Sequence, residues 1–208
     1  AKGLADDKNL IKLQEQLGED CEIPNHRRIL RPFGENIGMI LGESAQFVVL
    51  MQDSLALQLG LNIHGTALSS HIHSDGYKKS ISGPGAGNYL TVGKIFNEIK
   101  THFSSAALNK TFFHAHGTGT PQNRESESHI ISSISKAFGI EALPVTAIKS
   151  YLGHSLAAAG GDQMISTLGS WKNNLIPGIT STPELAENVY KENVEFLLQN
   201  KKFKDGEF

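Results

Sequence analysis

Two short motifs place histidines beside glycines and small hydroxyl residues, a combination typical of catalytic and ligand-binding sites. The motif FFHAHGTGTP contains His114 and His116 and ends at Pro121. The motif KSYLGH starts at Lys149 and ends at His154. Each motif follows an apolar stretch that suits a strand and precedes a stretch that suits a helix. Catalytic and ligand-binding groups gather at such strand-to-helix crossings, so both motifs are candidates for a functional site.

The elements that must position these motifs follow from the apolar pattern. It predicts strands at 37–51, where the run FVVLM suits a buried strand, and at 62–70, 111–115, 145–148 and from Val194, and helices at 7–17, 53–59, 89–103, 121–138 and 155–171. Strands that alternate with helices of this length indicate an α/β layered sheet. The helix after His154 begins with AAAGG, whose small side chains allow close approach to a neighbouring backbone.

Composition narrows the class of protein. The 208 residues carry a net charge of -2, from 19 basic and 21 acidic side chains, so a nucleic-acid partner is not expected. No stretch approaches the roughly 20 apolar residues that span a bilayer, and the N-terminus lacks the apolar core of a signal peptide. The single cysteine, Cys21, cannot form an internal disulfide. We therefore expect a cytoplasmic protein, and we expect both ends to be cuts in a longer chain.

Three segments together resemble one family. HGTGTP, then KSxxGH with its Ala/Gly-rich helix, and upstream the segment RPFGENIGMILGESAQFVVLM, are similar to the C-terminal half of the β-ketoacyl-acyl-carrier-protein synthases. The resemblance extends from Arg31 to Ile179. It implies an incomplete thiolase-like layered fold, with a mixed β-sheet covered by helices. We expect residues 1–36 to be a linker and helix from the preceding half, and residues 37–208 to form the C-terminal domain without its closing strands.

The resemblance also implies a reaction, the decarboxylative Claisen condensation of malonyl thioester with an acyl-cysteine enzyme. His116 and His154 would donate hydrogen bonds to the thioester oxygen on which charge develops. Lys149 would supply positive charge beside them. The remaining implied roles are pantetheine binding by Thr118 and Thr120, and support by Glu127, Gln163 and Gly153.

Implied partners are an acyl carrier protein, the N-terminal half of the synthase in the same or another chain, and a second copy in a homodimer of the full-length protein. No cofactor beyond the carrier's phosphopantetheine and no metal is implied. The family's nucleophilic cysteine precedes the RPF segment, outside this chain. Cys21 lies in the acidic segment GEDCEIP, which disfavours a thiolate, so the chain alone is expected to be inactive.

Several positions depart from the family pattern. Arg124 stands where an acidic residue is common, and this charge reversal is expected to alter the support of the histidines. Gln163 replaces a common Glu, which keeps the hydrogen-bonding shape but removes the charge. Gly34, Asn36 and Ile37 replace charged residues of the upstream segment.

Two other functions remain open from the residues. A metal-dependent hydrolase would use His114, His116, His154 and Asp162 as ligands. A non-catalytic carrier-binding module would keep the pantetheine contacts alone. His114 is otherwise expected to pack or hydrogen-bond locally. The pairs His71/His73 and Lys78/Lys79 are expected on the surface, and SGPGAGN (82–88) is expected to be a turn into a helix rather than a phosphate site.

Overall fold

Helices and short strands alternate along the part of the chain that the computed structural model describes, residues 30–35, 38–75 and 85–208. Its helices are α2 (Asp53–Gln58), α3 (Ala86–His102), α4 (Ser105–Leu108), α5 (Pro121–Ala137), α6 (Lys149–Leu152) and α7 (Ala159–Asn173), with a 3-10 turn η2 (Leu156–Ala158). Its strands are β1 (Phe113–His114), β2 (Leu143–Thr146), β3 (Leu175–Ile176), β4 (Val194–Phe196) and β5 (Lys201–Lys202). The predicted α/β alternation is therefore confirmed.

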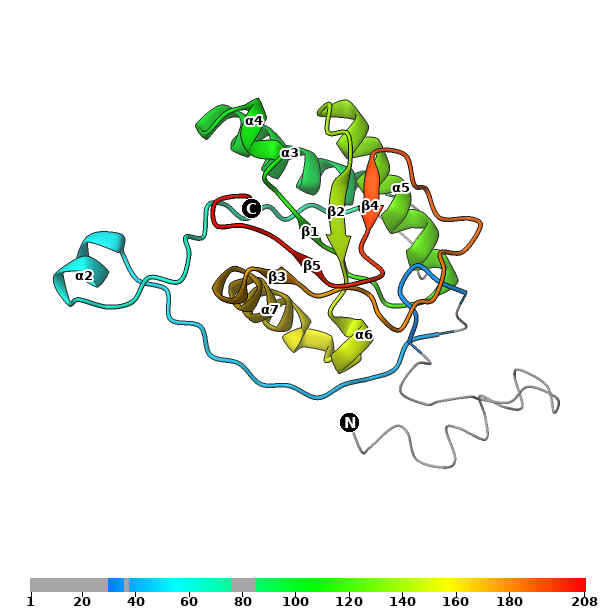
Figure 1. The fold of residues 1–208 in the computed structure, drawn as a ribbon, viewed down its shortest axis with the longest axis horizontal. Coiled ribbons are helices and arrows are strands. Elements are labelled where there is room, and N and C mark those ends of the chain that lie inside the picture. The colour runs from blue at the N-terminus through cyan, green and yellow to red at the C-terminus, as the bar shows by residue number, and fades with distance from the viewer. Residues whose placement is uncertain (1–29, 36–37, 76–84) are drawn as a thin grey trace.

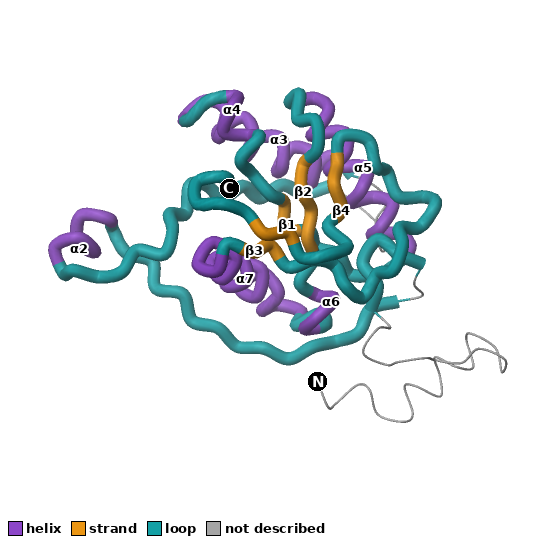
Figure 2. The backbone as a smooth tube through the Cα atoms, viewed as in Figure 1, coloured by secondary structure: helices purple, strands orange, loops and turns teal. Residues whose placement is uncertain are grey.

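The central sheet has the order β1-β2-β4, and both of its strand pairs are parallel. Phe113 pairs with Val145, and Leu143 pairs with Val194. Figures 1 and 2 show α3 and α5 on one side of these strands and α6 and α7 on the other. The carboxyl ends of β1 and β2 thus lead side by side into the two histidine motifs. A second, antiparallel pair, β3-β5, was not predicted.

The core lies between the sheet and the helices α3 and α5. Every residue of β2 is buried, which fits a central strand covered on both faces. Phe96 of α3 and Ile131 of α5 pack into the same cluster as Val145 of β2 and Phe196 of β4. Burying a side chain of this size contributes about 1.5–3 kcal/mol, so this cluster holds the sheet in place beneath the site.

The predicted helices at 53–59, 89–103 and 121–138 are confirmed with small shifts of their ends, and the one at 155–171 divides into η2 and α7. The helix predicted at 7–17, Cys21, Lys78, Lys79 and most of the SGPGAGN turn lie outside the described residues. None of the helices that the structure describes is both long and apolar enough to cross a membrane.

The strands predicted at 37–51 and 62–70 are wrong in the described structure. Residues 38–75, here called the arm, form a long loop that leaves the body and returns to it, with the short helix α2 at its outer end (Figure 1). Phe47 is 97% exposed, Val49 82% and Leu50 75%. The apolar pattern is that of a buried strand, but a strand also needs a hydrogen-bonded neighbour. Within the described residues, the arm meets another segment in this way only at the isolated bridge between Leu41 and His154.

The exposed side chains of the arm allow a prediction about association. Replacing Phe47 and Leu50 by Ser is expected to reduce self-association of the isolated chain, because their exposed apolar surface is lost. The free energy of unfolding should change by less than about 0.5 kcal/mol for each substitution. Sedimentation and urea unfolding measure the two quantities. The control Phe33→Ser, at a side chain that is 1% exposed, should cost about 3–5 kcal/mol, and an equal loss in the Phe47 variant would contradict the structure.

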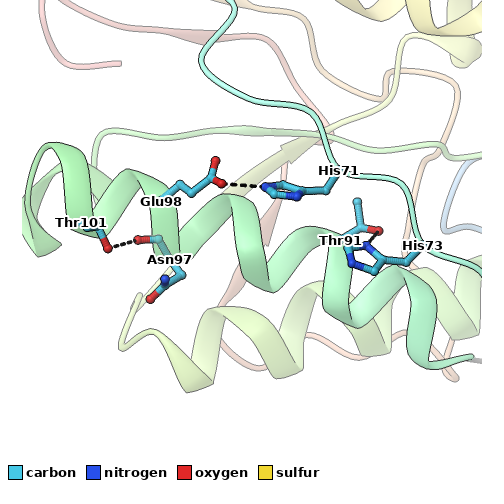
Figure 3. Close-up of polar contacts among 6 residues, drawn as sticks. All are labelled: His71, His73, Thr91, Asn97, Glu98 and Thr101. Carbon is cyan, nitrogen blue, oxygen red and sulfur yellow. Dashed lines mark hydrogen bonds and ion pairs between the residues drawn. The ribbon is translucent and has the colours of Figure 1, made fainter.

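The far end of the arm returns to the body along α3 through the two histidines predicted to lie on the surface. His71 Nε2 lies 2.8 Å from Glu98 Oε1, and His73 Nδ1 lies 3.0 Å from Thr91 Oγ1 (Figure 3). Both histidines are half-buried rather than fully exposed. Their role in the described structure is to attach the arm to the helix.

Candidate active site

The two motif histidines come together although 38 positions separate them in the sequence. His116 follows β1, and His154 follows α6, the short helix after β2. Because β1 and β2 are parallel neighbours, both turns leave the same edge of the sheet. The ring centroids of His116 and His154 lie 5.1 Å apart at an interplanar angle of 85°. The predicted convergence of the two rings is therefore present in the structure.

The turn that carries His154 is held against residues 40–42, here called the base of the arm. The His154 N–H donates to Ile40 O at 2.7 Å, and the Gly42 N–H donates to His154 O at 3.0 Å. Gly153 allows this contact, because its φ is +73° and a Cβ there would lie 3.0 Å from Gly42 N. Any other residue at 153 would be strained and crowded at once. The supporting role expected of Gly153 is thus a backbone one.

Fixed donors determine which nitrogen of each imidazole carries the proton. The Leu156 N–H donates to His154 Nδ1 at 3.0 Å, so the neutral ring carries its proton on Nε2. Leu156 has a φ of +56°, a left-handed conformation that costs free energy in a non-glycine residue. The N–H that faces His154 Nδ1 therefore comes from a strained position of the backbone. Lys149 Nζ lies 3.3 Å from His116 Nδ1 and favours the same tautomer. Both rings can then offer an Nε2–H donor.

Lys149 is buried to 2% exposure directly beside His116. Its ammonium donates to His116 O at 2.7 Å. Burial lowers the pKa of Lys149, while the negative charges of Glu127 and Asp162 oppose that shift. The two carboxylates therefore help to keep a cation beside His116.

Glu127 of α5 holds the turn that carries His116. Its Oε1 accepts the His116 N–H at 2.6 Å, and its Oε2 accepts the Gly117 N–H at 2.8 Å and the Asn123 amide at 3.2 Å. Burial raises the pKa of Glu127, and the two backbone N–H groups, Asn123 and Lys149 oppose the rise. The predicted supporting role of Glu127 takes the form of a bidentate backbone clamp.

Burial and neighbouring charge keep both imidazoles neutral. The pKa of His116 is lowered to about 4, chiefly because protein atoms surround the ring, although the residue keeps an exposed face, and also because Lys149 and His154 lie close. Burial and the Lys149 charge also lower the pKa of His154. At neutral pH the pair can therefore act as hydrogen-bond donors without carrying charge.

The two threonines predicted to bind pantetheine line the turn after His116. Thr120 caps α5, because its hydroxyl accepts the Asn123 N–H at 3.3 Å. Thr118 Oγ1 lies 3.1 Å from Thr120 Oγ1, and the Thr118 N–H donates to Asn123 Oδ1 at 2.9 Å. The capping alternative is thus confirmed for Thr120. Asn123, which joins this turn to Glu127, was not singled out from the sequence.

Gln163 and Arg124, which both depart from the family pattern, make contacts with different parts of the structure. The Gln163 amide donates to Ala115 O at 2.7 Å, so it supports the strand end before His116 as expected. Arg124 points elsewhere: it donates to Gly34 O at 2.8 Å, to Glu35 at 3.0 Å and to Asn188 at 2.8 Å. The expectation that Arg124 would alter the support of the histidines is wrong, because its guanidinium instead fastens the segment before the arm.

His114 is separate from the site. It is the last residue of β1, and both of its ring nitrogens are buried without a hydrogen-bond partner among the described residues. Of the two expected alternatives, local packing or a local hydrogen bond, the described residues show packing. Burial lowers the pKa of His114 to about 4, and the Lys149 charge adds to this.

The low pKa of His114 predicts a loss of stability in acid. Between pH 6.5 and 4 the unfolded chain binds a proton at this residue and the folded chain does not, so the free energy of unfolding falls as pH falls through this window. The variant His114→Leu should be more stable than the parent by about 2 kcal/mol at pH 5. Urea unfolding at pH 7 and pH 5 measures this. The exposed His64→Leu variant is the control, and equal acid sensitivity of the parent and the His114 variant would contradict the burial of an unpartnered ring.

The metal-hydrolase alternative lacks a suitable set of ligands. Within residues 30–35, 38–75 and 85–208, no three side chains of His, Cys, Asp or Glu converge as metal ligands would. The Lys149 ammonium faces His116 Nδ1, and its charge would repel a cation. Asp162 is engaged by Ser44, Gln46 and Ser155. The contacts of Asp162 with Ser44 and Gln46 were not predicted from the sequence.

Comparisons with known proteins show the family to which this chain belongs. A family model described as "Beta-ketoacyl synthase, C-terminal domain" matches residues 64–182. The β-ketoacyl-[acyl-carrier-protein] synthase FabY of Pseudomonas aeruginosa is 49% identical over 169 residues, which is 81% of this chain and 27% of that protein. The chain thus spans about a quarter of the length of this relative.

Solved structures give the same result. The crystal structure of the ketosynthase FabY from P. aeruginosa superposes with a TM-score of 0.82 at 47% identity, covering 86% of this chain and 28% of that one. A ketosynthase solved with its type II polyketide acyl-carrier protein superposes with a TM-score of 0.75 at 20% identity, covering 93% of this chain and 47% of that one. The predicted thiolase-like fold is therefore confirmed.

Proposed function

This chain belongs to the β-ketoacyl synthases and carries their C-terminal domain, and from that premise we propose that His116 and His154 stabilise a thioester enolate during decarboxylative condensation. The observation that carries the proposal is the 5.1 Å approach of two rings whose Nδ1 atoms both face fixed donors. Their Nε2–H groups are then available for one oxygen atom. Neutral donors aimed at developing charge are among the strongest contributors to catalysis.

The chemical steps follow from this arrangement. The bond between C2 of the malonyl thioester and its carboxylate breaks, carbon dioxide leaves, and the electron pair moves toward the thioester oxygen. The two Nε2–H groups stabilise that oxygen. The C2 carbanion then attacks the carbonyl carbon of an acyl-cysteine, and the cysteine sulfur leaves as a thiolate. The acyl-cysteine comes from a part of the synthase other than the residues described here.

The substrates are proposed to arrive on a carrier. The name of the P. aeruginosa relative includes the acyl carrier protein, which supports a phosphopantetheine thioester as the substrate. Thr118 and Thr120 are proposed to contact the pantetheine amides from the turn beside His116. Since each threonine hydroxyl keeps more than one hydrogen-bonding site, the contact between them and the cap of α5 leave capacity for a ligand.

The experiment joins the upstream half of a ketosynthase, which contains the cysteine, to this chain. The resulting protein is called the joined enzyme. The joined enzyme is expected to release carbon dioxide and form a β-ketoacyl carrier from an acyl and a malonyl carrier. Carrier binding without any turnover would instead favour the carrier-binding module. Activity lost on chelation of a stoichiometric metal would favour the hydrolase.

A further inference from the structure

Asp162 is a buried carboxylate that the proposed reaction does not use directly. It lies in the first turn of α7 and is 8% exposed. A buried carboxylate persists only where donors replace its water. Three side chains do so here: Ser44 Oγ at 3.1 Å and Ser155 Oγ at 2.5 Å donate to Oδ2, and the Gln46 amide donates to Oδ1.

These donors come from the two segments that surround His154. Ser155 is the next residue along the chain. Ser44 and Gln46 follow the base of the arm, where Ile40 and Gly42 bond the N–H and the C=O of His154. The carboxylate therefore joins both segments to the start of α7 and closes a ring of contacts around the histidine.

Gly161 leaves the space that this arrangement needs. A Cβ at 161 would lie 2.5 Å from the Gln46 Oε1 atom and 3.0 Å from its Cδ. The Gln46 side chain therefore crosses α7 over a glycine to reach Asp162. This explains one of the two glycines in the AAAGG run, while Gly160 has no atom within 4 Å of its Cβ position.

We propose that Asp162 is a positioning residue for His154, which fixes the imidazole by tying Ser155 and the base of the arm to α7. The proposal rests on the function proposed above for His154. The Asp162 charge also opposes the lowering of the Lys149 pKa, so the same carboxylate supports the cation beneath the site. The tests of this proposal therefore separate the positioning of His154 from the effect of the Asp162 charge on Lys149.

Activity is the first test. In the joined enzyme, Asp162→Ala is expected to lower kcat about 10- to 100-fold with little change in KM, because a small displacement of a catalytic group lowers the rate strongly. Asp162→Asn, which keeps the shape, should lose less. Gly161→Ala displaces only Gln46 and should lower kcat severalfold without destabilising α7. The control is Ser170→Ala, a buried residue of α7 whose hydroxyl donates to Ser166 O of the same helix.

Nuclear magnetic resonance of the 208-residue chain is the second test, and it does not depend on activity. The ring nitrogens of His154 should report the Nε2–H tautomer in the parent and in Ser170→Ala. In Asp162→Ala and in the double variant Ser44→Ala/Gln46→Ala they should report a mixture. In the double variant, which keeps the Asp162 charge beside Lys149, His116 should be unchanged. If both variants keep the parent tautomer and the parent kcat, the proposal is overturned. A joined enzyme without condensing activity would overturn the proposed function and leave the resonance comparison to decide on Asp162.

Discussion

Replacing His116 or His154 by Ala is expected to lower the condensation rate of the joined enzyme about 100-fold or more. Each substitution removes one of the two Nε2–H donors aimed at the developing oxyanion, and the loss of one such donor typically has this effect. Transfer of the acyl group onto the cysteine should change much less, because no charge then develops on the malonyl oxygen. Product formation and acyl-enzyme formation, measured separately, give the two rates.

The control for these variants is His102→Ala, an exposed histidine at the end of α3. It should leave both rates unchanged. A His116 or His154 variant that condenses as fast as the control would show that its ring is not a donor in the reaction.

A large loss of stability is also expected at the turn that carries His116, for Glu127→Gln. The parent carboxylate accepts the N–H groups of His116 and Gly117, whereas a Gln side chain places an NH2 group against one of them. Gly117 is buried, so its N–H left without an acceptor costs about 1–3 kcal/mol, and the displaced NH2 group adds a similar cost. We expect the free energy of unfolding to fall by about 2–4 kcal/mol. Urea unfolding at pH 7 measures it.

Glu125→Gln is the matched control for this substitution. Glu125 is exposed two residues earlier on α5, so the change of atoms is the same without the buried contacts. Its free energy of unfolding should stay within about 0.5 kcal/mol of the parent. Equal losses in the two variants would mean that Glu127 does not clamp the His116 turn.

The histidine site could be predicted because its signal is local. HGTGTP and KSYLGH each contain the side chain, the glycine turn and the start of the next helix within a few residues. Parallel pairing of the preceding strands then brings His116 and His154 together. Lys149 and Glu127 followed from the same motifs, and the structure places both against the His116 turn.

The supporting contacts could not be predicted, because they join distant positions. Ser44 lies 118 positions before Asp162, and Gln46 lies 116 before it. Side chains of such common types carry no signal for a partner so far away. Arg124 is similar: its guanidinium reaches Gly34, 90 positions earlier, rather than the histidines beside it in the sequence.

The arm shows a different limit of sequence patterns. FVVLM has the composition of a buried strand, yet Phe47 and its neighbours are exposed in the described structure. Side-chain pattern reports what a segment could bury, while strand formation also requires a partner for its backbone. The pair β3-β5 was missed for the opposite reason, since two-residue strands carry no alternation to detect.

The most direct test of two converging donors is carbon dioxide release from a malonyl carrier by the joined enzyme with its condensing cysteine replaced by Ala. This variant isolates decarboxylation from acyl transfer. With His116→Ala and His154→Ala added together, release should fall to the rate of malonyl carrier without enzyme. Release at the rate of the enzyme that retains both histidines would contradict the account.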